Sequence, residues 1–385
     1  MESTVPPAKD KPLFTPGPLT TSITVKQAMQ RDLGPRDHAF KRIIVEVRER
    51  LLKLAGVSRD EGFEAILLQG CGTMGVEGVI SCVVPRGGKA LVITNGAYGK
   101  RILKMTNALA EMTPVELAYE EHQPVDPADV DRVLSKQPDI DFVAIVHCET
   151  TSGMMNPIDE VGRVVKQHGK TYFVDAMSSF GAVPVDIQGW GIDHMVSSAN
   201  KAIEGVPGFS FAICRRADLE ANEGASRTLS LDLLAQLRGF EHDGQFLYTP
   251  PTHSILAFRQ ALDELDMEGG IEARGRRYAR NHEVLVAGMR EMGFETYLPD
   301  ELQGPIITTF HAPNVPGFDF NTFYDSVENK GYVIYGGKVL HTKSFRIAHV
   351  GRIFESDTRA LLGAIAQTLE EMGIRDTLAD RAVIA

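Results

Sequence analysis

The sequence lacks several features that would place it in a special class of protein. No two cysteines have the C-x-x-C spacing, which excludes a zinc ribbon and a dithiol redox motif. No run of about 18 uncharged apolar residues occurs, so no membrane span is predicted. We therefore expect free thiols and a cytoplasmic protein. The cysteines are Cys71, Cys82, Cys148 and Cys214.

Positive charge is also scarce, with 40 Lys and Arg against 51 Asp and Glu and a net charge of -11. Nucleic acids and anionic membranes do not attract an acidic protein, so neither is an expected partner. A small anionic substrate stays compatible with this balance, because a basic pocket can lie within an acidic surface. Residues 1–12 are polar and contain three prolines, and they are expected to form a loose tail rather than a signal peptide.

The middle of the chain alternates short apolar runs with amphipathic stretches such as 100–112 and 158–168. Runs rich in Val, Ile, Leu and Phe are typical of buried parallel strands. Their alternation with helical patterns predicts an α/β domain with a mostly parallel sheet. The strand-like runs are 64–69, 89–94, 115–119, 141–147, 170–174, 194–197 and 209–214.

The pattern changes after the middle of the chain. Two long helices are predicted over 252–267 and 271–292, followed by shorter strands and helices that indicate a smaller α+β domain. The predicted division is a segment and tail over 1–24, a large α/β domain over 25–267 and a small C-terminal α+β domain over 268–385. The later elements are strand-like 305–311, 332–335 and 344–348 and helix-like 321–330 and 356–372.

A glycine-rich segment, LQGCGTMG at 68–75, follows a strand and opens a helix. It matches the dinucleotide fingerprint imperfectly, and the next strand ends at Thr94 and Asn95, where that fingerprint requires an acidic residue. We therefore reject a nicotinamide cofactor. A glycine-rich turn into a helix N-terminus still suits a phosphate, although a tight turn with packing glycines and no ligand would have the same sequence pattern.

Two charged residues follow later strands. Asp175 ends an apolar strand, where ligands of α/β proteins bind, although it could instead cap the next helix. Lys201 lies among small and polar residues after another strand. Most lysines are solvated surface charges, but a lysine held in a crevice can have a lowered pKa and form a Schiff base.

Together these features supply what pyridoxal phosphate requires. Lys201 would form the Schiff base, Asp175 would keep the pyridine nitrogen protonated, and the helix N-terminus would hold the phosphate. Tyr98, which follows the strand at 89–94, is a candidate to stack on the ring. Lys201 and Asp175 together argue against a binding protein without catalysis.

At this point the chain resembles the class V aminotransferases among the fold-type I pyridoxal-phosphate enzymes. The resemblance covers nearly the whole chain, and within the group it is greatest to the enzymes that transfer an amino group between 2-aminoethylphosphonate and pyruvate. Cysteine desulfurases share the fold but need a cysteine late in the chain, and none follows Cys214. The matching motifs are FTPGPL at 14–19, VDAMSSFG at 174–181, SSANK at 197–201, RTLSLD at 227–232 and PTH at 251–253.

The resemblance implies roles for individual residues, with Lys201 and Asp175 as catalytic residues that also contact the cofactor. It implies that Thr151 lies near the ring hydroxyl, that Thr252 reaches the cofactor phosphate of the neighbouring subunit in a homodimer, and that Arg346 holds the substrate anion. No metal is implied. The other implied cofactor contacts are Gly72, Thr73, Met74, Tyr98 and Asn200, and the other implied substrate contacts are Gly17 and Arg36.

The activity implied is transfer of the amino group of 2-aminoethylphosphonate to pyruvate, which gives phosphonoacetaldehyde and L-alanine. Several residues near the substrate end depart from the family pattern, including Leu33 and Arg36 in place of tryptophans and Gly336 in place of a proline. Two alternatives therefore stay open. One is an ammonia-lyase acting on 1-hydroxy-2-aminoethylphosphonate, and the other is an alanine–glyoxylate or serine–pyruvate type of transaminase.

Overall fold

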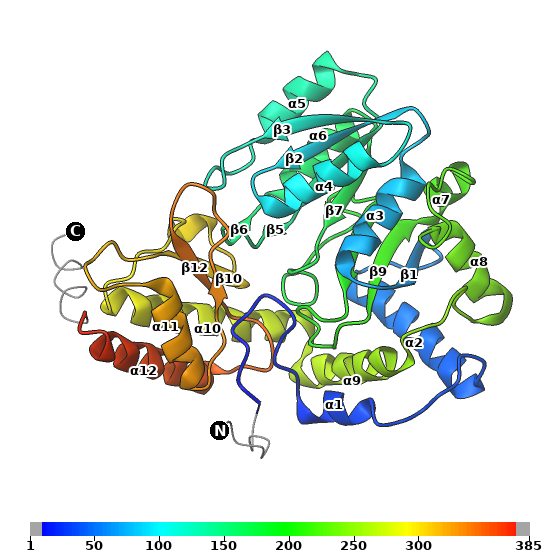
Figure 1. Ribbon diagram of the computed structural model, residues 1–385. Helices are drawn as coiled ribbons and strands as arrows, with labels where there is room; N and C mark the ends of the chain where they lie inside the picture. Colours follow the sequence, from blue (N-terminus) through cyan, green and yellow to red (C-terminus); the bar gives the residue numbers. More distant parts are fainter. Residues whose placement is uncertain (1–9, 375–385) are drawn as a thin grey trace.

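A seven-stranded sheet forms the centre of the larger part of the molecule (Figure 1). The computed structural model describes residues 10–374. Every neighbouring pair of strands is parallel except the two pairs that β9 makes, so the predicted mostly parallel sheet is confirmed. In spatial order the strands are β1 (Phe63–Gln69), β9 (Phe209–Arg215), β8 (His194–Ser198), β7 (Thr171–Asp175), β4 (Phe142–Val146), β2 (Gly88–Thr94) and β3 (Met112–Ala118).

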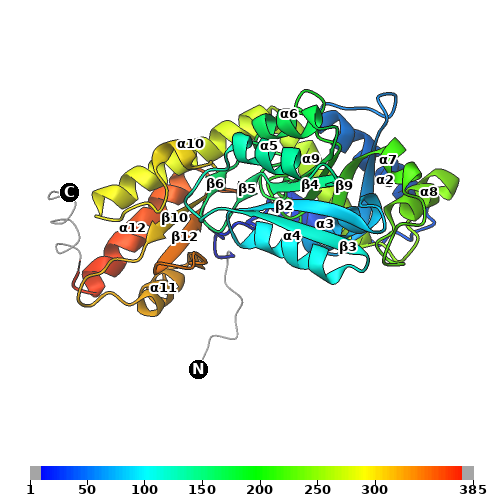
Figure 2. The same ribbon diagram turned by 90° about the horizontal axis from the view of Figure 1, so that it is seen from above.

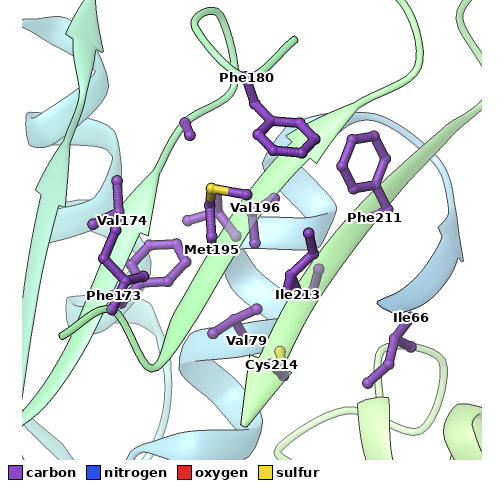
Figure 3. Close-up of a cluster of buried hydrophobic side chains, with 14 of the residues drawn as sticks. Ile66, Val79, Phe173, Val174, Phe180, Met195, Val196, Phe211, Ile213 and Cys214 are labelled. Atoms are coloured by element: carbon purple, nitrogen blue, oxygen red, sulfur yellow. The ribbon is translucent and has the colours of Figure 1, made fainter. Parts of the chain in front are cut away.

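Helices cover both faces of this sheet. Figure 2 shows α5 and α6 on one face and α4 on the other. Strands between two helical layers are buried on both sides, which explains their nearly continuous apolar sequences. Figure 3 shows one part of this core, where Val79 of α3 lies beneath Val196 of β8 and Ile213 of β9. The helices are α1 (Ile23–Ala28), α2 (His38–Leu54), α3 (Gly72–Val83), α4 (Ala97–Ala108), α5 (Pro127–Lys136), α6 (Ile158–Gln167), α7 (Arg216–Ala221), α8 (Leu233–Asp243) and α9 (Thr252–Glu268).

A smaller layer of helices and strands follows α9. The turn between α9 and α10 contains Gly269 at φ 104°, a backbone conformation that favours glycine. An antiparallel sheet in the order β10-β12-β11 packs with the three helices of this part (Figure 1). Its elements are α10 (Gly270–Glu291), β10 (Ile307–His311), α11 (Phe320–Asn329), β11 (Tyr335–Gly336), β12 (Ser344–Ala348) and α12 (Glu355–Glu371).

Some boundaries differ from the sequence-based expectations. The helix predicted over 100–112 begins earlier and ends at Ala108, because residues from Met112 onward pair with β2 and belong to β3. The apolar run 332–335 contributes only the start of β11, since pairing with β12 is limited to Tyr335 and Gly336. A short antiparallel pair was not predicted, and it consists of β5 (Cys148–Glu149) and β6 (Met154–Met155).

We propose that the chain divides near residue 267, as the sequence predicts. One hydrophobic cluster runs from Val25 to Leu265, and a second contains Phe14 and residues from Leu285 to Ile374. The ends of the predicted outer segments, residues 1–9 and 375–385, lie outside the described residues. No helix within 10–374 is long and apolar enough to cross a membrane.

A buried ion-pair network joins α10 to the loop that follows β8. Glu204 is 1% exposed, and its Oε1 accepts hydrogen bonds from Arg277 Nη2 and Tyr278 Oη, both at 2.6 Å. Arg274 Nη1 donates to the carbonyl of Ala202 at 2.9 Å. Glu204 itself has φ 68°, in a region that costs a non-glycine residue about 1–3 kcal/mol. The network therefore holds a strained loop at a fixed position.

Glu204→Gln should destabilise the protein because it removes a charge between two arginines while keeping the side-chain volume. Breaking a buried ion pair costs about 3–5 kcal/mol. The free energy of unfolding in urea measures this loss. Glu272→Gln, an exposed change on α10, the helix that carries the two arginines, is the control and should stay within about 0.5 kcal/mol of wild type. A loss below about 1 kcal/mol for Glu204→Gln would mean that the network contributes no more than an ordinary hydrogen bond.

Candidate active site

The predicted site residues gather at one edge of the large sheet. All strands except β9 run in the same direction, so their carboxyl ends share this edge. In α/β proteins, ligands bind there. A cavity of about 200 Å³ opens at this edge. Its lining includes six of the predicted residues: Gly72, Thr73, Tyr98, Asp175, Asn200 and Lys201.

The turn after β1 presents an open helix N-terminus to the cavity. α3 begins at Gly72 and has no side-chain cap. The N–H of Met74 donates to the carbonyl of Cys71 at 2.9 Å, which leaves the N–H groups of Gly72 and Thr73 without helical partners. Gly72 packs closely against the side chain of Met177. Burial acts to raise the pKa of the Cys71 thiol, but hydrogen bonds from Met74 and Thr73 outweigh it and lower that pKa. The same donors and the helix dipole favour an anion here.

Lys201 follows β8 and is partly buried. Its Nζ donates to the carbonyl of Pro16 at 2.9 Å. Gly17 has φ 129°, and a Cβ there would lie 2.9 Å from the lysine Nζ, so only glycine allows this approach. Burial lowers the pKa of Lys201, although Tyr98 and Asp175 act to raise it. A lowered pKa increases the fraction of neutral amine, which is the nucleophilic form.

Asp175 ends β7 and is 6% exposed. Burial raises its pKa to about 6, while the N–H of Met177 and the charges of Lys201 and Arg101 act to lower it. Its Oδ1 accepts the Met177 N–H at 2.9 Å. Oδ1 of this carboxylate therefore stabilises a turn, whereas Oδ2 accepts no hydrogen bond from the described residues.

Tyr98 is held at the cavity by a buried carboxylate. Glu149 Oε2 accepts the backbone N–H groups of Tyr98 and Gly99, each at 3.1 Å, and so caps the first turn of α4. A Cβ on Gly96 would lie 2.3 Å from Cγ of Glu149, so the close approach requires glycine. Burial acts to raise the pKa of Tyr98, but its hydrogen bond with Thr150 and nearby cations, beginning with Lys201, lower it.

Arg346 lies on β12 of the smaller sheet and is 2% exposed. Its Nη1 donates to the carbonyl of Thr150 at 2.8 Å and its Nε to that of Gly336 at 3.1 Å. These bonds fix the guanidinium and leave Nη2 uncommitted to a backbone carbonyl. Burial lowers the pKa of Arg346, while Tyr98 acts to raise it, which places the arginine within electrostatic range of the cavity. Within residues 10–374 no carboxylate forms an ion pair with it.

Six predicted residues do not line this cavity within one chain, among them Gly17, beside the Lys201 side chain, and Arg346, on the smaller sheet. Met74 is 45% exposed beside it, and the hydroxyl of Thr151 bonds the Glu149 carboxylate at 2.7 Å. Thr252 begins α9, whose first turn contacts the loop before β9 through a hydrogen bond from Ser254 Oγ to the carbonyl of Pro207 at 2.8 Å. Arg36, in the segment between α1 and α2, lines a separate hollow beside α8. The roles of these residues stay predictions.

Sequence reasoning missed three residues of the site. Met177 lines the cavity beneath Gly72, Glu149 positions Tyr98, and Arg101 lines the cavity from α4. The sequence offered a signal for Glu149, because it is an acidic residue three positions after the end of the apolar strand β4, at the ligand-binding edge of the sheet. Arg101 had none, since its approach depends on how α3 and α4 pack.

These residues fit pyridoxal phosphate. Lys201 offers an amine, Asp175 a buried carboxylate, Tyr98 a ring, and the open end of α3 an anion site, all on one cavity. The glycines at 17 and 72 keep the lysine and the helix end accessible. Such a set matches the amine, ring nitrogen and phosphate of that cofactor.

The aminotransferase class-V profile matches residues 22–340. The chain is 46% identical over 362 residues, 94% of its length and 97% of the relative, to a protein of Syntrophobacter fumaroxidans named 2-aminoethylphosphonate–pyruvate transaminase. It is 47% identical over 355 residues, 92% of its length and 96% of the relative, to a Klebsiella pneumoniae protein of the same name. The chain therefore belongs to the class V aminotransferases.

Solved structures of other aminotransferases have the same fold. Pyridoxamine–pyruvate aminotransferase from Mesorhizobium loti has a TM-score of 0.85 and 24% identity over 99% of this chain and 98% of that one. Ureidoglycine–glyoxylate aminotransferase from Bacillus subtilis has a TM-score of 0.87 and 22% identity over 100% and 99%. The fold-type I architecture expected from the sequence is thus confirmed.

Asp175→Asn should distinguish a cofactor partner from a turn cap. The amide keeps an oxygen for the Met177 N–H, but it cannot supply negative charge to a protonated pyridine nitrogen. We expect the variant to bind pyridoxal phosphate and to lose about 10²-fold or more in the single-turnover rate of amino-group transfer. Asp186→Asn, which also changes a carboxylate that caps a turn, is the control and should keep the wild-type rate. A loss of tenfold or less for Asp175→Asn would assign it to the turn alone.

Proposed function

We propose that this class V aminotransferase uses pyridoxal phosphate to move the amino group of 2-aminoethylphosphonate to pyruvate, giving phosphonoacetaldehyde and L-alanine. The observation that carries the proposal is the convergence of Lys201, Asp175 and the open end of α3 on one cavity, with Arg346 nearby. Relatives 46–48% identical over more than nine-tenths of the chain bear the name of this activity, which supports the substrate pair.

The bound cofactor would supply a protonated ring that accepts electrons from the substrate carbon. Lys201 is placed to act as the base and acid that moves a proton at that carbon, because its amine is desolvated and held by one carbonyl. Asp175 would hold the proton on the ring nitrogen, and Tyr98 would cover the ring.

Arg346 would bind the anionic end of each substrate. Its guanidinium is fixed by two carbonyls and carries no ion pair with a described carboxylate. A planar fork matches both a phosphonate and a carboxylate. The phosphonate donor and pyruvate can therefore use the same arginine in turn, as alternating half-reactions require.

The direct test is to supply 2-aminoethylphosphonate, and separately its 1-hydroxylated form, with and without pyruvate. The proposal predicts one alanine for each phosphonoacetaldehyde, no ammonia, and no multiple turnover without pyruvate. Ammonia released from the hydroxylated amine without pyruvate would instead indicate a lyase. Turnover only with alanine and glyoxylate, or with serine and pyruvate, would indicate the third class of activity.

Arg346→Lys should reduce both half-reactions even though it keeps the charge, because an ammonium cannot make the bidentate contact. Loss of a charge-assisted hydrogen bond costs about 1.5–3 kcal/mol, or roughly 10–100-fold in kcat/KM. The two half-reactions are measured separately, with Arg352→Lys as a control outside the cavity. If only the pyruvate half is slowed, another group binds the phosphonate, and Arg36 is the first to examine.

We also propose a homodimer in the cytoplasm, with Thr252 of one subunit reaching the cofactor phosphate of the other. Several large apolar side chains stand exposed on the larger part of the molecule, including Leu229 at 83%, Met74 at 45% and Tyr248 at 42%. The Tyr248 hydroxyl bonds the carbonyl of Leu229 at 3.3 Å, so these two lie together. All four cysteines are free thiols, which suits a reducing compartment.

Light scattering of the purified protein should give twice the chain mass of 42.2 kDa. Burial of exposed apolar groups such as Leu229 would drive this association. Leu229→Glu should lower the dimer fraction, whereas Met267→Glu, at an apolar residue 74% exposed on α9, serves as the matched control. A monomer with full transaminase activity would contradict shared active sites.

A further inference from the structure

Arg101 lines the cavity, and the roles proposed for Lys201, Asp175 and Arg346 do not involve it. It projects from the first part of α4, one turn after Tyr98. Its Nη1 donates to Oγ1 of Thr73 at 3.2 Å, and its guanidinium carbon lies 4.8 Å from the centroid of the Tyr98 ring. The arginine thus connects the first turn of α3 with the aromatic residue of α4.

Arg101 forms no ion pair within residues 10–374, although its charge acts to lower the pKa of Asp175. Some exposed arginines pair with carboxylates, as Arg86 does with Glu111 at 3.0 Å and Arg280 with Glu355 at 2.8 Å, whereas Arg42 and Arg276 form no ion pair within residues 10–374. Arg101 forms no such pair although it lies in an acidic protein, and its head group is held at Thr73 by a neutral hydroxyl. An oriented, unpaired guanidinium on a cavity wall is suited to bind an anion.

The partial positive charge at the open end of α3 is too small to balance the charge of a phosphate group. A phosphate monoester carries about −1.5 to −2 charges at pH 7. A helix N-terminus supplies the equivalent of about half a positive charge. The turn at Gly72 and Thr73 therefore neutralises only part of a phosphate, and Arg101 is the cationic side chain bonded to that turn.

We propose that Arg101 binds the phosphate group of pyridoxal phosphate, together with the backbone of Gly72 and Thr73. The inference rests on the proposed cofactor and adds the residue that recognises its charged end. Arg101 would act as an affinity determinant that selects the phosphorylated cofactor over pyridoxal. Its contact with the Tyr98 ring would keep the guanidinium in place before the cofactor enters.

The test compares dissociation constants of pyridoxal phosphate and pyridoxal for the wild type and Arg101→Gln, measured by equilibrium dialysis in the absence of substrate. Removing a charge-assisted hydrogen bond should weaken pyridoxal phosphate about 10–100-fold. Pyridoxal binding should change by less than about twofold, as for an ordinary surface substitution. For Arg101→Lys, the dissociation constant of pyridoxal phosphate should fall between those of the wild type and Arg101→Gln, because lysine keeps the charge but cannot make the bidentate contact of a guanidinium.

Lys104→Gln provides the matched control, since it removes one positive charge from the exposed face of α4 one turn further along. It should leave both dissociation constants at the wild-type value. Inorganic phosphate is an independent probe, because it lacks the ring. Its inhibition constant against pyridoxal phosphate should rise about 10–100-fold in Arg101→Gln.

Two results would overturn the proposal in different ways. Equal weakening of pyridoxal phosphate and pyridoxal in Arg101→Gln, with unchanged inhibition by phosphate, would show that the arginine acts through Tyr98 and not on the phosphate. A wild-type protein that binds neither pyridoxal compound would overturn the proposed cofactor, and the role of Arg101 with it.

Discussion

The position of one amine, Nζ of Lys201, is the constraint on which the rest of the site depends. The amine must leave water to become a nucleophile, yet it must be held at a fixed point. The carbonyl of Pro16 supplies that hold, and Gly17 allows the approach because it has no Cβ. The following loop passes through Glu204, whose left-handed backbone is held by arginines of α10. Residues from three distant parts of the chain thus fix a single atom.

The large sheet and the smaller antiparallel sheet supply complementary charges around that amine. The parallel strands bring Asp175 and the open end of α3 to one edge, where a cofactor with a ring nitrogen and a phosphate can bind. The smaller sheet contributes Arg346, which is buried and fixed by backbone carbonyls. A protein with a net charge of -11 therefore concentrates cations where anionic groups are expected to bind.

Much of this arrangement could be predicted from particular residues. The apolar runs that end at Gln69, Thr94 and Asp175 indicated parallel strands, and residues placed after such strands must meet at one edge. The motif around Lys201 and the resemblance it carried indicated the cofactor. Short sequence segments were enough to predict these features, because each pattern lies within one strand and the turn that follows it.

What could not be predicted depends on contacts between segments far apart in sequence. Arg101 reaches Thr73 only because α3 and α4 pack side by side. Glu149, in β5, caps the first turn of α4 although the two elements are about 50 residues apart in sequence. The short β5–β6 pair has too few residues to show a period. Arg36 and Thr252 illustrate a further limit, since a single chain does not bring them to the cavity and the predicted role of Thr252 depends on a second subunit.

One measurement tests the central claim most directly, namely identification of the lysine that pyridoxal phosphate modifies. The protein is incubated with the cofactor, reduced with borohydride, digested and mapped by mass spectrometry. The account predicts a pyridoxyl group on Lys201 at about one per chain, because this amine is desolvated and lies on the cavity with Asp175. Modification of another lysine, or none at Lys201, would contradict it.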